Sequence, residues 1–535
     1  MPHLQTGFHP KLVSSWRDGY NLSSFKADVL AALTVAIVAL PLSMAIAIAS
    51  HVSPERGLYT AIIGGFIISA LGGSRFQVGG PAGAFIVLVA SITDSRGLDG
   101  LFLATMMAGA ILFAVGISGL GRFIRYVPHA VTVGFTAGIA VIIFASQIKD
   151  LLGLDLPAAE PAAILPKVQA LWDARASFSH QVALISALTI ALIQIAKRLA
   201  PRLPGMLIAI TVAGLAVALF DLPVETIHDR FGDLPRSLPL PGLPDLSRDS
   251  LLAALPWALS FTLLGAIESL LSAVVADGMS GARHRSNAEL VAQGAANVGA
   301  ALFGGFCTTG TIARTATNVR AGSRGPVSGM LHAVFVLLFM LVAAPLAGHI
   351  PLAALAGVLA VVAWNMAEKV EIWDLARSNR ADALVIAVTF LLVVFRDLTE
   401  GIIAGFALGG LLFIHRMSQS ATLDQTEDET LAPGQVVVRL SGPYFFGAAA
   451  QVGAALDQIA DHPRHFVLDL SDLDYLDSSG ARALALLAQR IRRKGGQMEL
   501  RAVSPQQRRL LEKAGLKPPL VRYLTDPPEQ PPATD

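Results

Sequence analysis

Long apolar runs separated by short polar stretches occupy the chain up to about residue 416. Most runs are long enough to cross about 30 Å of hydrocarbon as an α-helix that rises about 1.5 Å per residue. The pattern predicts fourteen segments, near residues 28–50, 57–72, 81–93, 100–118, 129–149, 179–196, 205–220, 251–276, 287–304, 310–320, 326–345, 350–367, 381–395 and 399–416. The third and the tenth are too short to span a bilayer.

The segments divide into two halves, 28–220 and 251–417, that share one pattern. Each half begins with a long span and has a short third segment that follows glycine. Because each half holds an odd number of segments, the second would be inverted relative to the first. Matching short segments interrupted by Gly or Pro indicate a binding site near the middle of the membrane. The sequence therefore predicts an α-helical multi-pass membrane protein with two inverted seven-segment repeats.

After Arg416 the pattern becomes that of a soluble domain. Short apolar runs predict β-strands at 436–440, 466–470 and 497–503, and amphipathic stretches predict helices at 479–493 and 505–514. Such alternation is typical of a small α/β domain. We assign it to residues 433–526, with a linker at 418–432 and a Pro-rich, acidic tail at 527–535 that we expect to be disordered.

Composition agrees with a chain that lies mostly in lipid. It is 53% hydrophobic and 15% charged, where soluble domains average roughly 25% charged residues. The net charge of +1 gives no reason to expect a nucleic-acid partner. The single cysteine, Cys307, excludes an intramolecular disulfide framework and a thiolate metal cage built by this chain alone. We therefore expect no metal cofactor.

Basic residues predict the orientation, because Lys and Arg concentrate in short cytoplasmic loops. The loops after even-numbered segments contain Arg122, Arg125, Lys197, Arg198, Arg202, Arg283, Arg285, Arg320, Arg324, Lys369, Arg377, Arg380 and Arg416. With residues 1–27 inside, both termini would be cytoplasmic. The start of the chain lacks the apolar core of a signal peptide, so we expect the first span to direct insertion into the inner (plasma) membrane.

Two polar breaks mark the candidate site, one at Gln77–Ala84 and one at Gly304–Arg320. Open backbone at membrane depth is tolerated only where protein buries it or a wet cavity faces it. A short helix starting near Gly310 would direct its free N–H groups and positive dipole end into that cavity, with Arg314 one turn in. The breaks therefore predict an anion site. We expect no enzyme, because no nucleophile–base pair or metal-ligand spacing occurs.

Glu268 lies among apolar neighbours inside the eighth segment. A charge at such a position costs about 2.5 to 3.5 kcal/mol on insertion scales, and intramembrane acids are functional by default. The functional interpretation is a carboxylate that binds a proton as an anion enters; the alternative is a Glu satisfied by hydroxyl groups inside the bundle. Arg314 would either attract substrate or be the counter-ion of Glu268, and the second role would weaken the proton hypothesis.

These residues resemble the sulfate permease (SulP) family of anion transporters, bacterial relatives of the animal solute-carrier anion exchangers and of prestin. The resemblance is carried by Leu40-Pro41, Gly80-Pro81-Ala82, 264–269 and 313–318, and by a C-terminal domain similar to the STAS fold with Asp477-Ser478-Ser479-Gly480 at a strand-to-helix turn. It implies a core domain that moves against a gate domain, a substrate held between half-helices three and ten, and a homodimer. It also implies that sodium-coupled relatives have Asp at the Glu268 position with a hydroxyl one turn later, where this chain has Ser272.

Pro41 is followed by Leu42 where many relatives have Gln, and Ile46 replaces an aromatic residue. The site then has one fewer hydrogen-bond donor for oxyanions, so specificity is expected to depend on these two positions. The resemblance and the polar breaks together predict a substrate site formed by Pro41, Leu42, Ile46, Gly80, Pro81, Ala82, Gly83, Ala84, Thr308, Thr309, Gly310, Thr311 and Arg314, with Glu268 and Ser272 as coupling residues. For the threonines, plain helix packing is the alternative.

The predicted function is secondary active transport of a small anion by alternating access, with a proton favoured over sodium as the coupling ion. Sulfate, bicarbonate and dicarboxylates such as fumarate or succinate all suit the site. Alternatives are an anion exchanger, a sodium-coupled bicarbonate symporter, a nucleobase permease, or a non-transporting sensor whose α/β domain binds a cytoplasmic protein. Ser478 is a candidate phosphorylation site; the alternative is that Ser478 and Ser479 only cap the helix.

Overall fold

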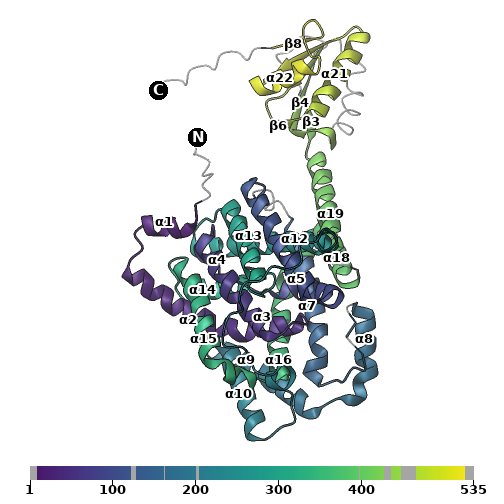
Figure 1. The fold of residues 1–535 in the computed structure, drawn as a ribbon. Coiled ribbons are helices and arrows are strands. Elements are labelled where there is room, and N and C mark those ends of the chain that lie inside the picture. Colours follow the sequence, from purple (N-terminus) through teal and green to yellow (C-terminus); the bar gives the residue numbers. More distant parts are fainter. Residues whose placement is uncertain are drawn as a thin grey trace. The chain divides into compact units, whose positions relative to one another are not determined.

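The computed structural model describes residues 9–121, 128–158, 160–161, 163–200, 204–396, 398–426, 435–447 and 465–524. It has two compact units, one ending at Phe406 and one beginning at Ala407 (Figure 1). The first corresponds to the predicted membrane part and the second contains the predicted α/β domain. Arg122, Arg125, Arg202 and the predicted disordered tail at 527–535 lie outside the described residues.

The first half of the membrane unit is helical wherever the apolar pattern predicts a span. After the short α1 (Lys11–Arg17), its elements are α2 (Leu22–Ala49), α3 (Pro54–Tyr59), the π-helical η1 (Thr60–Gly64), α4 (Gly65–Leu71), η2 (Gly83–Phe85), α5 (Ile86–Ile117), α7 (His129–Leu152), α9 (His180–Leu199) and α10 (Gly205–Leu219). The predicted third and fourth segments are both within α5. They are separated by a kink at Gly97, whose φ of 68° is readily adopted only by glycine.

The second half repeats this arrangement. Its helices are α12 (Arg248–Ser280), α13 (Ser286–Leu302), the short α14 (Ile312–Arg320), α15 (Val327–Gly348), α16 (Leu352–Met366), α18 (Arg380–Phe395) and α19 (Leu398–Gln419), the last of which continues past Phe406 into the second unit. Eight helices in the described part are long and apolar enough to cross a membrane. Every predicted segment is therefore helical, although the third and fourth share one helix.

Besides α1, which the sequence pattern does not predict, three short helices between the spans are absent from the prediction. They are α8 (Ile164–Asp173), α11 (Ile227–Phe231) and α17 (Lys369–Ser378). The first and last follow the fifth span of each half, so they occupy equivalent positions in the two repeats. Their apolar residues are too few and too interrupted to resemble spans, which is why the hydropathy pattern does not predict them.

Glycines allow α5 and α13 to pack backbone against backbone. A Cβ added to Gly294 of α13 would lie 2.5 Å from the Phe113 backbone N and 2.6 Å from the Gly109 backbone O of α5. A Cβ on Gly109 would lie 2.7 Å from the Gly294 backbone O. Small residues at helix contacts are the usual means of close approach in membranes. This contact joins a helix of the first half to a helix of the second.

We expect Gly294→Ala to destabilise the membrane unit, because the added methyl would meet backbone atoms that move only if a whole helix moves. Overpacking of this kind costs about 1 to 3 kcal/mol. The measurement is the unfolding temperature of the purified chain in detergent. Gly278→Ala is the matched control, since Gly278 lies in α12 with no atom within 4 Å of its added Cβ. Equal unfolding temperatures for the two variants would contradict the expectation.

The second unit contains a mostly parallel sheet in the order β3-β4-β5-β7-β8, with β6 also paired to β4. The elements are β3 (Thr422–Thr426), β4 (Gln435–Tyr444), β5 (His465–Asp469), β6 (Leu473–Leu476), α21 (Ser478–Arg493), β7 (Gln497–Arg501), α22 (Pro505–Lys513) and β8 (Val521–Tyr523). Only the β3–β4 pair is antiparallel among the described pairs.

Three of these strands are missing from the sequence prediction. The proposed linker at 418–432 is wrong in part, because α19 continues to Gln419 and β3 follows at Thr422–Thr426; residues 427–434 lie outside the described part. Strand β3 is polar and gains its order from pairing with β4. Strands β6 and β8 have 4 and 3 residues, which is too short for an alternating pattern to be recognised.

Candidate functional site

The two polar breaks predicted from the sequence meet inside the membrane unit. Their extended parts form a two-stranded antiparallel pair, β1 (Gly79–Gly80) with β2 (Thr309–Gly310), in which Gly79 is opposite Gly310. The half-helices begin directly after this pair, at Gly83 and Ile312. The second helix starts two residues later than Gly310 because 309–310 are used in the strand, so Arg314 is its third residue. We call this meeting point the crossing.

Side chains from the opposite half hold each extended segment. Glu289 of α13 accepts hydrogen bonds from the backbone N–H groups of Gly73 (2.8 Å) and Ser74 (3.0 Å). Asn318 of α14 donates to the backbone O of Phe76 at 2.9 Å. These bonds satisfy backbone groups that would otherwise be unpaired at membrane depth. The segment leading to β1 is therefore fixed by helices of the second half.

The segment leading to β2 is held in the corresponding way. Arg56 of α3 donates to the backbone O of Gly304 at 2.9 Å, and the Thr60 hydroxyl accepts from the Phe306 N–H at 2.9 Å. Asn297 of α13 bonds both backbone groups of Thr308, at 3.0 Å to its N–H and 2.8 Å to its carbonyl. Two of these three side chains come from the first half, so the two halves brace each other.

Helix α12, which carries Glu268, is tied to both sides of the crossing. Gln77 Nε2 donates to the Ser269 hydroxyl and carbonyl, each at 3.1 Å. The Ser272 hydroxyl donates to Thr315 Oγ1 at 3.1 Å, and Thr315 Oγ1 accepts from the Val78 N–H at 3.1 Å. These contacts place α12 directly against β1 and α14.

Arg314 is the largest side chain that the membrane unit buries fully, with 1% of its surface exposed. Its Nη2 donates to the Ser43 hydroxyl at 2.9 Å and to the Pro81 carbonyl at 3.4 Å, and its Nη1 donates to the Gly79 carbonyl at 3.4 Å. All three acceptors are neutral. A Cβ at Gly80 would lie 1.8 Å from Nη1, so glycine is required where the guanidinium crosses the first break.

Glu268 has no ion pair with Arg314 in the described part of the chain. Its Oε2 is buried and has no hydrogen-bond partner among the described residues. The predicted alternative of a counter-ion for Arg314 is therefore not formed in this conformation. The hydroxyl of Ser272 is directed to Thr315 instead of to the carboxylate. A fully buried cation and a partly buried acid thus lie near the crossing without neutralising each other directly.

The predicted threonines are engaged with protein. The hydroxyls of Thr309 and Thr311 donate to the backbone carbonyls of Gly265 (3.2 Å) and Val78 (3.4 Å). Thr308 packs against Gly64, where an added Cβ would lie 2.5 Å from its Oγ1. The contacts agree with the packing alternative for Thr309 and Thr311, whereas the buried hydroxyl of Thr308 has no hydrogen-bond partner among the described residues.

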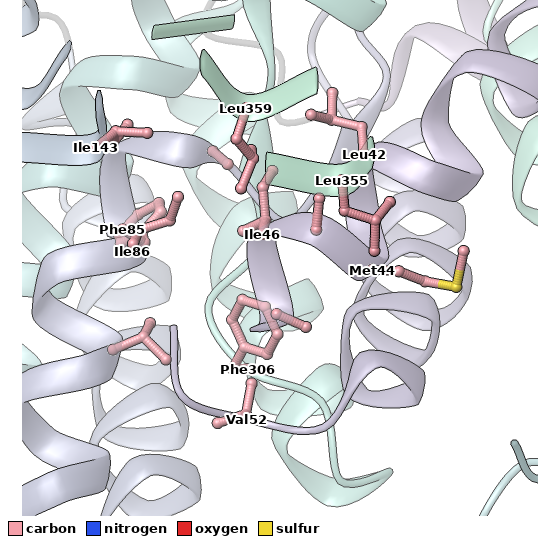
Figure 2. Packing of buried hydrophobic residues seen from close by; sticks show 14 of the residues in the cluster. Leu42, Met44, Ile46, Val52, Phe85, Ile86, Ile143, Phe306, Leu355 and Leu359 are labelled. Carbon is pink, nitrogen blue, oxygen red and sulfur yellow. The ribbon is translucent and has the colours of Figure 1, made fainter. Parts of the chain in front are cut away.

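Apolar side chains enclose the crossing on the side of α2, α7 and α16. Figure 2 shows Leu42 and Ile46 of α2 with Leu355 and Leu359 of α16, and Phe85 with Ile86 at the start of α5. A Cβ at Gly83 would lie 3.4 Å from Ile143 Cδ1 and 3.6 Å from Met366 Sδ, so α7 and α16 cover the start of the first half-helix. Pro41 instead lines an apolar pocket of about 510 Å³ shared with α10 and α15.

Several site residues do not follow from the sequence analysis. Ser43 bonds Arg314, Gln77 and Thr315 join α12 to the crossing, and Glu289 holds the first segment. His332 of α15 is fully buried, and neither ring nitrogen has a partner among the described residues. Polar residues inside predicted spans are the only local signal for this set, and that signal does not say which residues meet.

In the second unit, Asp477 caps α21, since its Oδ1 accepts from the Gly480 N–H at 2.7 Å. The interpretation of Ser478 and Ser479 as the caps is therefore wrong. Ser478 is exposed at the first helical position. Its phosphorylation stays a prediction.

Two inverted repeats with facing half-helices, followed by a STAS-like domain, define a class of membrane transporters for anions. The family model described as the sulfate permease family matches residues 25–389, and the STAS domain model matches residues 426–525. The chain belongs to the sulfate permease family. This confirms the predicted resemblance and fold class, and it excludes the nucleobase-permease alternative.

Relatives with high similarity are named as transporters, which agrees with the prediction that the chain is not an enzyme. The chain is 40% identical to the putative sulfate transporter YvdB of Bacillus subtilis over 505 residues, 93% of this chain and 95% of that protein. It is 30% identical to the bicarbonate transporter BicA of Synechocystis sp. over 521 residues, 92% of this chain and 90% of the relative.

Solved structures agree with the fold. The transmembrane domain of a cyanobacterial bicarbonate transporter BicA is similar with a TM-score of 0.64 and 30% identity, covering 72% of this chain and 98% of that one. The structure of SLC26A9 has a TM-score of 0.82 at 19% identity, covering 94% and 88%. The second match supports the fold alone.

Proposed function

We propose that the chain is a secondary active transporter that binds a small anion at the crossing and carries it by alternating access. One observation carries this proposal: the guanidinium of Arg314 is buried and bonded only to neutral oxygens. A buried charge without a counter-charge is costly. An anion supplied from solution would provide that counter-charge, and a guanidinium can bind a carboxylate or oxyanion through two parallel hydrogen bonds.

The charges near the crossing indicate how coupling would work. Arg314 supplies one positive charge, and each half-helix N-terminus supplies about half a charge. With Glu268 ionised, the sum is about +1, which a monoanion such as bicarbonate balances. With Glu268 protonated, the sum is about +2, which a dianion such as sulfate or fumarate balances. A dianion would therefore enter with one proton, whereas a monoanion needs none.

The apolar side chains that cover Gly83 indicate which helices would move relative to one another between the two access states. Ile143 and Met366 lie on α7 and α16, whereas the half-helices are braced to α12 and α13. We propose that the braced helices form the moving core, and that α7 and α16 belong to the gate against which it slides. Neutralising the crossing with an anion lowers the cost of moving it past these apolar side chains.

A proton suits this site better than sodium. A sodium ion needs several oxygen ligands, but the Ser272 hydroxyl is directed to Thr315 and is not paired with Glu268. A sodium-coupled bicarbonate symporter and an anion exchanger are the alternatives that flux measurements would distinguish.

Cytoplasmic termini, an inner-membrane location and a homodimer are further parts of the proposal.

The test is uptake by the purified full-length chain in proteoliposomes, with radiolabelled sulfate, bicarbonate, fumarate and succinate measured at two external pH values. We expect uptake of at least one anion, stimulated by an inward proton gradient when the anion is divalent. Stimulation by sodium would favour the symporter alternative, and strict dependence on internal anion would favour exchange. Absence of flux for every anion would contradict the proposal and favour a sensor.

A further inference from the structure

We propose that the membrane unit has a second anion site, separate from the crossing, that binds a phosphate or sulfate group at the end of the unit carrying α1. A pocket of about 490 Å³ lies there between the α1–α2 turn, the segment before β1, the end of α12 and the end of α14. The residues that line this pocket include Ser15, Asp18, Tyr20, Arg75, Ser323 and Arg324. We call it the terminal pocket.

Two buried hydroxyl groups in the terminal pocket have no partner. Ser15 and Ser323 are 4% and 7% exposed, and neither Oγ has a hydrogen-bond partner among the described residues. Buried polar groups are nearly always satisfied by protein, water or ligand. Both residues line one polar pocket from different elements, so rotation of either hydroxyl toward the pocket would let it donate to a ligand with several acceptor oxygens.

The charges around the terminal pocket favour an anion. Two guanidiniums, of Arg75 and Arg324, face one carboxylate, Asp18, which is paired with Arg75. The guanidinium of Arg324 has no ion pair or hydrogen bond within the described ranges of the chain. Next to the pocket, burial and the guanidiniums of Arg285 and Arg75 lower the pKa of Lys11, and the carboxylates of Asp277 and Asp18 oppose this shift without cancelling it.

The other acidic group near this pocket is already occupied. Asp28 accepts hydrogen bonds from the backbone N–H groups of Arg324 (2.6 Å) and Gly325 (3.1 Å), and from the Tyr20 hydroxyl at 2.7 Å. The last carbonyl groups of α14 are also satisfied, since those of Thr317, Asn318 and Val319 accept from the N–H groups of Ala321, Ser323 and Gly322. The acceptor atoms of both features are therefore engaged by protein donors.

The terminal pocket touches both discontinuous elements of the transport site. Phe76 lies three residues before β1, and Val319 lies in the last turn of α14. Asn318 already joins these two stretches through the Phe76 carbonyl. A ligand bound here would tie them to the α1–α2 turn and would stabilise one arrangement of the core. An effect on transport rests on the proposed function, whereas binding itself does not.

Binding is tested with inorganic phosphate as the probe, by calorimetric titration of the purified full-length chain. We expect Arg324→Gln to weaken phosphate binding by about tenfold, because a charge-assisted hydrogen bond is lost. Ser323→Ala should weaken it by a smaller factor and is the milder variant if the first one folds poorly. Arg320→Gln is the matched control, since Arg320 is exposed at the end of α14 and does not line the pocket.

Arg314→Gln separates this site from the crossing. Phosphate binding that survives Arg314→Gln and falls with Arg324→Gln supports the terminal pocket; the reverse pattern overturns it, as does the absence of phosphate binding to the unaltered chain. The source of the phosphate group is identified in nanodiscs with and without phosphatidic acid. A soluble ligand gives equal phosphate affinity in both, whereas a lipid headgroup at this site would compete and lower the apparent phosphate affinity in the nanodiscs that contain phosphatidic acid. If Arg314→Gln abolishes uptake but keeps phosphate binding, the crossing and the terminal pocket are separate sites, as proposed.

Discussion

Arg314→Gln is expected to lower anion uptake by about 100-fold or more. The amide keeps a donor for the Ser43 hydroxyl but removes the buried positive charge that the anion would neutralise. Loss of two charge-assisted hydrogen bonds, each contributing about 1.5 kcal/mol, corresponds to roughly a hundredfold in affinity. Arg314→Lys should be intermediate, because an ammonium keeps the charge but cannot form the two parallel bonds of a guanidinium.

The measurement is the initial rate of uptake over a range of anion concentrations, in proteoliposomes with equal amounts of reconstituted protein. The loss should fall on apparent affinity as well as on maximal rate. Arg320→Gln removes the same charge from the exposed end of the same helix and should transport normally. Uptake by Arg314→Gln within about threefold of the unaltered chain would show that the guanidinium is a structural group.

Glu268→Gln is expected to uncouple the uptake of a dianion from the proton gradient. The amide imitates the protonated acid, so the crossing would keep a charge of about +2 and would accept sulfate or fumarate without taking up a proton. Accumulation driven by an inward proton gradient should fall to the level seen without a gradient, whereas equilibrium exchange should continue. Uptake of a monoanion should decrease, because the loaded site would no longer be neutral.

The control for this prediction is Ser272→Ala on the same helix. It removes a hydroxyl that bonds Thr315 but leaves the carboxylate intact, so the dependence on the proton gradient should remain. If a proton gradient changes accumulation equally in the unaltered chain and in Glu268→Gln, then Glu268 is not the coupling group. If sodium replaces the proton gradient and Ser272→Ala abolishes its effect, the sodium-coupled alternative is correct.

Much of the membrane unit could be predicted because hydrocarbon imposes a strict requirement on each segment. A span must be apolar over its full length, so fourteen segments and two breaks are visible without any knowledge of their contacts. The bend at Gly97 was not predicted, because an isolated glycine between two spans is equally consistent with a loop. Short elements such as α17 and β8 were missed because neither is long enough to show a period.

The contacts at the crossing could not be predicted from the local sequence pattern. Arg314 is visible as a charge in an apolar region, but its partner Ser43 is 271 positions away, and Gln77 and Ser269 are separated by 192. No local pattern encodes such pairs. The threonines attracted attention through their number, yet their hydroxyls bond or pack against protein. Glu289 and Glu268 are both acids inside predicted spans, and only the contacts of Glu289, such as those with Gly73 and Ser74, distinguish an anchoring group from an unpartnered one.

The bracing between the halves also has a consequence for biogenesis. Segment 72–78 is released from the ribosome long before Glu289 and Asn318, which satisfy its backbone. Until the ninth and tenth segments arrive, the N–H groups of Gly73 and Ser74 and the carbonyl of Phe76 lack these partners and must be hydrated or sheltered by the insertion machinery. The first half therefore inserts as an incomplete structure, and α13 and α14 supply contacts that a segment made more than two hundred residues earlier requires.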